Sequence, residues 1–133
     1  MTDTFTPAAR AIFAKTVLAH VATLEPDGSP NVTPVWVELE GDDIVINTAL
    51  GRAKARNVAS DGRVAVSLTD PDDPYVVIAV RGTVTGFTTI GADEVIDRLA
   101  AKYLGVPDYP YRRVGEVRVN VRITPERISE QPA

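Results

Sequence analysis

The sequence predicts a mainly β fold with three short helices, an α+β fold in which six antiparallel strands close into a barrel. Apolar and polar residues alternate along several segments, most regularly over residues 117–123, as in strands that bury one face. Turn-forming sequences such as Glu25-Pro26-Asp27-Gly28 separate most of these segments, so neighbouring strands are expected to pair in antiparallel order. With 133 residues and a hydrophobic content of 44%, the chain has a modest core, which favours closure of the sheet.

The first half of the chain is predicted to hold one helix and three strands. Thr6 suits the N-cap position and Pro7 the first helical position, so a helix is expected over residues 8–17. The strands of this half are expected at residues 18–24, 31–39 and 44–48. Pro34 lacks an N–H group, which predicts that its strand lies at an edge of the sheet or contains a bulge.

The second half is predicted to hold two helices and three strands. An Ala-rich helix is expected over residues 52–59, and an amphipathic helix over residues 92–104 that ends at Gly105. The strands are expected at residues 63–69, 75–87 and 117–123. Gly82 lies inside the second of these strands, where a glycine indicates a bulge or a close approach of another backbone.

Composition limits the classes of partner. The formal net charge is −4, so the surface as a whole is negative and repels nucleic acid. A cluster of cations in such a chain is therefore expected to serve one local site. The N-terminal residues carry no cationic stretch and no long apolar segment follows, so neither a signal peptide nor a membrane span is expected. We therefore expect a cytoplasmic protein with one domain over residues 1–133, with no nucleic-acid or membrane partner.

The chain offers few residues for unaided catalysis. It has no cysteine, and its one histidine, His20, lies in an apolar segment where a histidine is usually structural. The acidic cluster Asp70, Asp72 and Asp73 is interrupted by prolines and is typical of a turn, so no metal site is expected. Neither a phosphate-binding glycine loop nor a dinucleotide-binding fingerprint is present. No catalytic residue is identified, and any difficult chemistry is expected to come from a bound cofactor.

The segment around residues 47–58 predicts where such a cofactor binds. Arg52 and Lys54 lie at the start of the Ala-rich helix, where free N–H groups carry partial positive charge and cations are unfavourable. A bound anion would reconcile the two cations with the helix end, because all of these groups could contact one phosphate. The alternative is a solvated basic helix face.

Two segments could frame a flat ring beside this phosphate. Asn47-Thr48-Ala49 leads directly into the basic helix, and Thr33-Pro34-Val35-Trp36 is expected on a neighbouring strand. Backbone groups that Pro34 leaves unpaired could form hydrogen bonds with the edge of a heterocycle. Trp36 could stack on that ring, or equally serve as a packing or interface residue.

The order and spacing of these motifs resemble those of the pyridoxamine 5′-phosphate oxidase-like split-barrel superfamily. The resemblance runs from about residue 18 to residue 123 and rests on Ala22-Thr23-Leu24, Asp27-Gly28-Ser29-Pro30, Thr33-Pro34-Val35-Trp36, Thr48 through Asn57-Val58, and Val80-Arg81-Gly82-Thr83-Val84. The short chain and the Arg-Ala-Lys-x-x-Asn form resemble the branch that uses the deazaflavin coenzyme F420 rather than FMN.

The resemblance implies a homodimer of six-stranded split barrels with two cofactor sites at the subunit interface. It also implies an F420-dependent reductase, which transfers a hydride from the reduced cofactor to an unsaturated organic substrate. An FMN-dependent oxidoreductase of the same fold and a non-catalytic F420 carrier are the alternatives. Residues 124–130 supply no recognisable second phosphate site, which argues against pyridoxamine phosphate oxidase activity.

Carried over to this sequence, the resemblance assigns site residues. Arg52 and Lys54 would bind the cofactor phosphate with support from Asn57. The candidates for lining the ring are Thr33, Pro34, Val35, Trp36, Thr48 and Ala49. Three further cations could contact the acidic tail of F420, namely Arg56, Arg112 and Arg113. For Arg112 and Arg113, which lie in a loop, the alternative is that both side chains are simply exposed to solvent. A proton could come from solvent or from a tyrosine, the candidates being Tyr75, Tyr109 and Tyr111.

Overall fold

The computed structural model describes residues 4–132, which form three helices and seven strands. The helices are α1 (Pro7–Phe13), α2 (Ala53–Ser60) and α3 (Ala92–Leu104). The strands are β1 (Ala19–Leu24), β2 (Pro30–Val35), β3 (Glu38–Glu40), β4 (Asp43–Ala49), β5 (Arg63–Asp70), β6 (Asp73–Thr88) and β7 (Arg118–Pro132). The predicted α+β class and the antiparallel pairing are confirmed.

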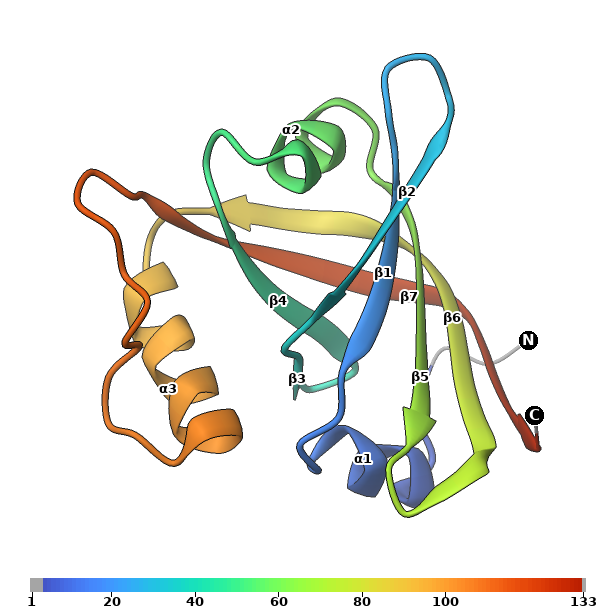
Figure 1. Cartoon of the computed structure of the whole chain (residues 1–133). Coiled ribbons are helices and arrows are strands. Elements are labelled where there is room, and N and C mark those ends of the chain that lie inside the picture. Colours follow the sequence, from blue (N-terminus) through green and yellow to red (C-terminus); the bar gives the residue numbers. More distant parts are fainter. Residues whose placement is uncertain (1–3, 133) are drawn as a thin grey trace.

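All seven strands belong to one antiparallel sheet in the order β2-β1-β5-β6-β7-β4-β3. The sheet curls strongly, with α1 and α2 at its opposite ends and α3 beside β4 on its outer side (Figure 1). Within the described residues, the two outermost strands, β2 and β3, do not pair with each other. The prediction of six strands in a closed barrel is therefore wrong in both the strand number and the closure.

The seventh strand arises because the predicted strand 31–39 is broken at Val37. The hydroxyl of Tyr103 accepts a hydrogen bond from the Val37 N–H at 3.1 Å, and Lys102 Nζ donates to the Val37 carbonyl at 2.7 Å. Both backbone groups of Val37 are thus engaged by α3 instead of a strand. The chain before the break forms β2 at one edge of the sheet, which confirms the edge position predicted from Pro34, and the chain after it forms β3 at the other edge.

β6 and β7 form the longest pairing in the sheet and continue well past residue 123. The register shifts between Arg81 and Gly82: Arg81 pairs with Arg127 and Gly82 with Pro125, which leaves Glu126 of β7 as the extra residue, and the pairing extends to Pro132. A Cβ atom at Gly82 would lie 2.6 Å from the carbonyl oxygen of Thr124. Both the bulge and the close backbone approach predicted for Gly82 are therefore present, and β7 continues through the bulge past its predicted end at residue 123.

The core has two parts on opposite faces of β4. Ile44 and Ile46 join the main cluster inside the curled sheet, together with residues of α1 such as Phe13. Val45 points the other way and packs with Leu99 of α3 in a smaller cluster. This explains the unbroken apolar run of β4, which is buried on both faces. Among residues 4–132, no helix has the length and apolar character that crossing a membrane requires.

Candidate anion and ring site

A pocket of about 260 Å³ lies among α3, the chain between β2 and β3, and the beginning of α2. Its lining residues are Leu18, Pro34, Val35, Trp36, Asn47, Arg52, Lys54, Ile96, Leu99, Tyr109, Tyr111 and Arg118. The structure thus brings together in one pocket five of the nine predicted site residues, namely Pro34, Val35, Trp36, Arg52 and Lys54. The other four, Thr33, Thr48, Ala49 and Asn57, are not among its lining residues.

The basic end of the pocket begins at the N-terminus of α2. Gly51 adopts a positive φ of 93° that turns the chain from β4 into the helix, and Arg52 follows at the N-cap. No side chain caps this end and no acidic residue lies in the first turn. The first N–H groups of α2 therefore remain available beside two cations, as the sequence predicts.

Arg118 at the start of β7 supplies a third cation that the sequence analysis missed. Its side chain is only 3% exposed. The Nε atom donates to Asn47 Oδ1 at 2.8 Å, and the guanidinium lies 5.1 Å from the ring centre of Tyr109. In the sequence it appears on the polar face of a strand, which predicts solvent exposure. Only the pairing of Arg118 with Ala49 across β4 and β7 places it in the pocket.

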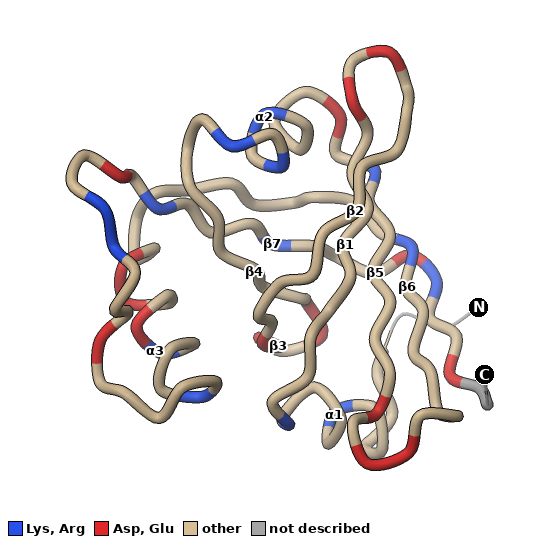
Figure 2. The backbone as a smooth tube through the Cα atoms, in the orientation of Figure 1, with Lys and Arg blue, Asp and Glu red and all other residues tan. Residues whose placement is uncertain are grey.

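Positive charge exceeds negative charge around this pocket. Arg52 contacts Glu116 at 3.3 Å and Arg118 contacts the same carboxylate at 3.2 Å. Within the described residues, Lys54 forms no ion pair. Burial lowers the pKa of Lys54 below its usual value, and the neighbouring Arg52 and Arg118 lower it further. Cations on α2 and at the start of β7 lie on the same side of the molecule (Figure 2).

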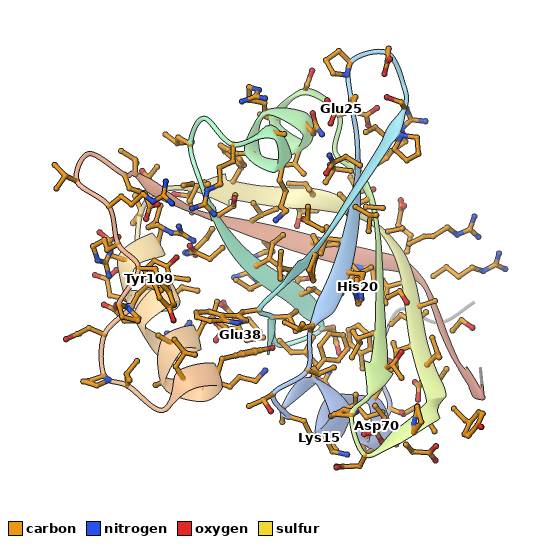
Figure 3. All side chains as sticks on the ribbon, viewed as in Figure 1. Lys15, His20, Glu25, Glu38, Asp70 and Tyr109 are labelled. Carbon is orange, nitrogen blue, oxygen red and sulfur yellow. The ribbon has the colours of Figure 1, made fainter. Side chains whose placement is uncertain are left out.

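An aromatic wall adjoins the cations. The indole of Trp36 stacks on Tyr103 with ring centres 5.2 Å apart, and Tyr109 meets Trp36 edge-on at 6.0 Å. Tyr109 lies where the loop after α3 folds back toward the sheet (Figure 3). One face of Trp36 is thus used in packing, while the residue still lines the pocket. Of the three tyrosines considered as proton donors, Tyr109 and Tyr111 line the pocket and Tyr75 does not.

The side chain of Asn57 forms hydrogen bonds with two residues outside α2. Its Nδ2 donates to Thr23 Oγ1 at 3.0 Å and to Glu25 Oε2 at 2.8 Å, and the residue is 3% exposed. These bonds fasten α2 to β1, and Glu25 lies next to α2 in Figure 3. In this arrangement Asn57 holds the helix whose first turn carries Arg52 and Lys54.

Two further candidates are buried hydroxyl groups. Thr33 Oγ1 and Thr48 Oγ1 are inaccessible to solvent and have no hydrogen-bond partner among the described residues. Buried hydroxyls are usually paired, so these two atoms retain unused hydrogen-bonding capacity on the strands next to the pocket. Ala49, which follows Thr48 on β4, is also buried.

The loop cations Arg112 and Arg113 differ in their contacts. Arg112 forms ion pairs with Asp93 at 2.7 Å and with Asp97 at 2.8 Å, and Asp97 also accepts a hydrogen bond from the Tyr109 N–H. Arg112 therefore fastens the loop to α3, whereas Arg113, which is exposed as Arg112 is, forms no ion pair within the described residues. Arg56 donates to the carbonyl of Gly51, which closes the turn that precedes α2.

The comparisons with known proteins agree on one family. A family model described as pyridoxamine 5′-phosphate oxidase matches residues 5–131. Among solved structures, an F420 reductase is 28% identical with a TM-score of 0.80, over 90% of this chain and 94% of that chain. HupZ from Group A Streptococcus is 24% identical with a TM-score of 0.70, over 97% and 98% of the two chains. A conserved hypothetical protein from Mycobacterium tuberculosis is 23% identical with a TM-score of 0.72, over 99% of this chain and 88% of that chain. The last two show the fold alone, and no curated protein matches this chain.

Proposed function

We propose that this chain, which belongs to the pyridoxamine 5′-phosphate oxidase family, is an oxidoreductase that binds coenzyme F420 in the pocket between α2 and α3. The observation that carries the proposal is the convergence of three cations and an uncapped helix N-terminus beside an aromatic wall. The similarity to an F420 reductase at 28% identity favours the deazaflavin over FMN. The proposed cofactor-binding domain is the whole chain, residues 1–133.

The residues present fit such a cofactor. Arg52, Lys54 and Arg118 supply charge for a phosphate, and the free N–H groups of α2 add neutral donors at the same place. Val35, Trp36 and Tyr109 offer apolar surface for a ring, and the unpaired hydroxyls of Thr33 and Thr48 are further polar groups on the adjoining strands. When bound in its reduced form, the deazaflavin supplies a hydride for an unsaturated organic acceptor.

The contribution of this chain to the reaction is orientation. Tyr103 and Lys102 fix Val37 through its N–H and carbonyl groups, so the preceding segment Pro34–Trp36 is held in place beside the pocket. Asn57 holds α2 against β1, so the phosphate-binding end has a fixed position relative to that segment. Fixing both ends of a long cofactor restricts its ring to one orientation and reduces the entropy lost on reaching the reactive geometry.

We further propose that the protein acts as a homodimer that buries the outer face of β1, β5 and β6. This face carries small side chains, with Ala22, Ala65 and Ala79 lining one shallow hollow. Val32 beside them is 62% exposed. Arg81 and Arg127 also line this hollow, but most of its surface is apolar, which suits a second copy of the chain. Sedimentation velocity at micromolar concentration should give the mass of a dimer, and a monomer would contradict the proposal.

The function is tested by binding and turnover measured side by side. Equilibrium titrations with F420 and with FMN should show preference for F420. Reduced F420 should then be re-oxidised by members of a panel of conjugated enones and quinones, with no requirement for added metal or nicotinamide. Tight binding of F420 without turnover on any acceptor would support a carrier instead, and turnover with reduced FMN alone would support the FMN-dependent alternative. Binding of neither cofactor would overturn the proposal.

Lys54 gives the binding a predicted pH dependence. A phosphate beside Lys54 stabilises the ammonium form, so the pKa of Lys54 is higher in the complex than in the free protein, where burial lowers it. Affinity for F420 is therefore full below the free-protein pKa of Lys54 and falls as pH rises from that pKa to the one in the complex. In the wild type, the dissociation constant should therefore begin to rise at a pH below the usual lysine pKa of 10.5.

The matched control is Lys54→Arg, because a guanidinium keeps its charge over this range. Arg52, Arg118, Glu116, Tyr109 and Tyr111 are unchanged in that variant, so the comparison isolates the lysine. Equal pH dependence in the two proteins would contradict the assignment of Lys54 to the phosphate.

A further inference from the structure

Glu116 is the one carboxylate among the described residues that contacts the pocket cations. Its side chain is 7% exposed, and its two oxygens divide between two arginines: Oε2 contacts Arg52 at 3.3 Å and Oε1 contacts Arg118 at 3.2 Å. Glu116 is not itself a lining residue of the pocket, whereas both arginines are. The carboxylate therefore lies behind the cations that face the ligand space.

We propose that Glu116 is an internal counter-anion that competes with the ligand phosphate for Arg52 and Arg118, and so sets the affinity and charge selectivity of the site. The inference rests on the proposed anion-binding function of this pocket. Glu116 stabilises the ligand-free protein, because it neutralises a buried guanidinium, and it weakens anion binding through the same charge.

The contacts of the two arginines favour competition between Glu116 and the ligand over a role in which Glu116 only orients the arginines. Arg52 has a half-exposed side chain and a long contact with Glu116, so little holds its guanidinium to the carboxylate when a second anion arrives. Arg118 has other partners that remain in place, since Asn47 Oδ1 accepts from its Nε and the Tyr109 ring lies against it. Removing the charge of Glu116 would therefore leave both arginines close to their present positions while raising the net positive charge of the pocket.

The test is Glu116→Gln, which keeps an oxygen that can accept from the arginines and removes only the charge. The proposal gives this variant two opposite effects. Its thermal midpoint without ligand should be lower than that of the wild type, and its affinity for F420 and for inorganic phosphate should be roughly tenfold higher. The thermal shift caused by saturating phosphate should be larger in the variant than in the wild type.

The matched control is Glu94→Gln, which removes the same charge from an exposed position in the first turn of α3. Affinity in this control should change by less than about twofold, because exposed charges are screened by solvent and salt. If Glu116 only orients the arginines, Glu116→Gln will bind both anions more weakly than the wild type, and the inference is overturned. Unchanged affinity overturns it as well.

The two probes separate this inference from the proposed function. Tighter binding of inorganic phosphate by Glu116→Gln, with no binding of F420 or FMN to any variant, would support the competing role of Glu116 and remove the proposed cofactor. Binding of F420 that is no tighter in Glu116→Gln than in the wild type would leave the proposed function standing and refute the competition.

Discussion

Replacing both Arg52 and Lys54 with alanine is expected to weaken F420 binding by about a hundredfold or more. Each single change removes one charge-assisted contact with the cofactor phosphate, and each should cost about 1.5–3 kcal/mol of binding free energy. The fold should be retained, because cations at a helix N-terminus are unfavourable and the Arg52 side chain is 51% exposed. Fluorescence titration of the single and double variants measures the effect.

The matched control for this pair is Arg63→Ala. Arg63 is an exposed arginine of β5 that pairs with Asp61 at 2.7 Å and does not line the pocket. Its removal changes the net charge by as much as each single variant does, so F420 affinity should stay within about twofold of the wild type if the pocket cations act locally. An Arg52 and Lys54 double variant with the affinity of this control would show that F420 binds elsewhere on the protein or not at all.

The parts of the fold that the sequence predicts well are those governed by local signals. The spacing of Val95, Ile96 and Leu99 with Gly105 beyond predicts α3 at the bounds observed, and Gly105 has the positive φ of 70° expected of a C-terminal glycine. Arg52 and Lys54 are also locally encoded, since their position at the start of a helix follows from the sequence around them. The structure places both in the pocket.

The parts that sequence reasoning misses depend on residues far apart in the chain. The break between β2 and β3 depends on hydrogen bonds of Val37 with Lys102 and Tyr103 of α3, and the sequence around Val37 does not predict these bonds. The hydrogen bonds of the Asn57 amide to Thr23 and Glu25 likewise join segments far apart in the chain, and the sequence around Asn57 does not predict them. Both features have the same cause, because a hydrogen-bonding group pairs with whichever partner the tertiary structure brings to it.

Arg118 is expected to be the largest single contributor to the stability of the pocket. Its guanidinium joins Asn47, Glu116 and Tyr109, and its side chain is almost fully buried. Arg118→Met retains much of the apolar volume but leaves Glu116 with only the longer contact to Arg52, and leaves Asn47 Oδ1 without its donor. Removing one partner of a buried ion pair costs about 3–5 kcal/mol, because the remaining charge is left uncompensated.

For a chain of this size we expect the thermal midpoint of Arg118→Met to fall by roughly 10–20 °C. Arg98→Met is the matched control, because Arg98 pairs with Glu38 at 2.6 Å but has a 55% exposed side chain. An exposed pair of this kind contributes about 1 kcal/mol or less.

The double variant Arg118→Met with Glu116→Gln should recover part of the lost stability, since it removes the uncompensated carboxylate as well. If Arg118→Met unfolds at the same temperature as Arg98→Met, or the double variant is no more stable than Arg118→Met, then Glu116 and Arg118 are not coupled. A coupled pair would mean that the carboxylate proposed to compete with the ligand also holds Arg118 in place.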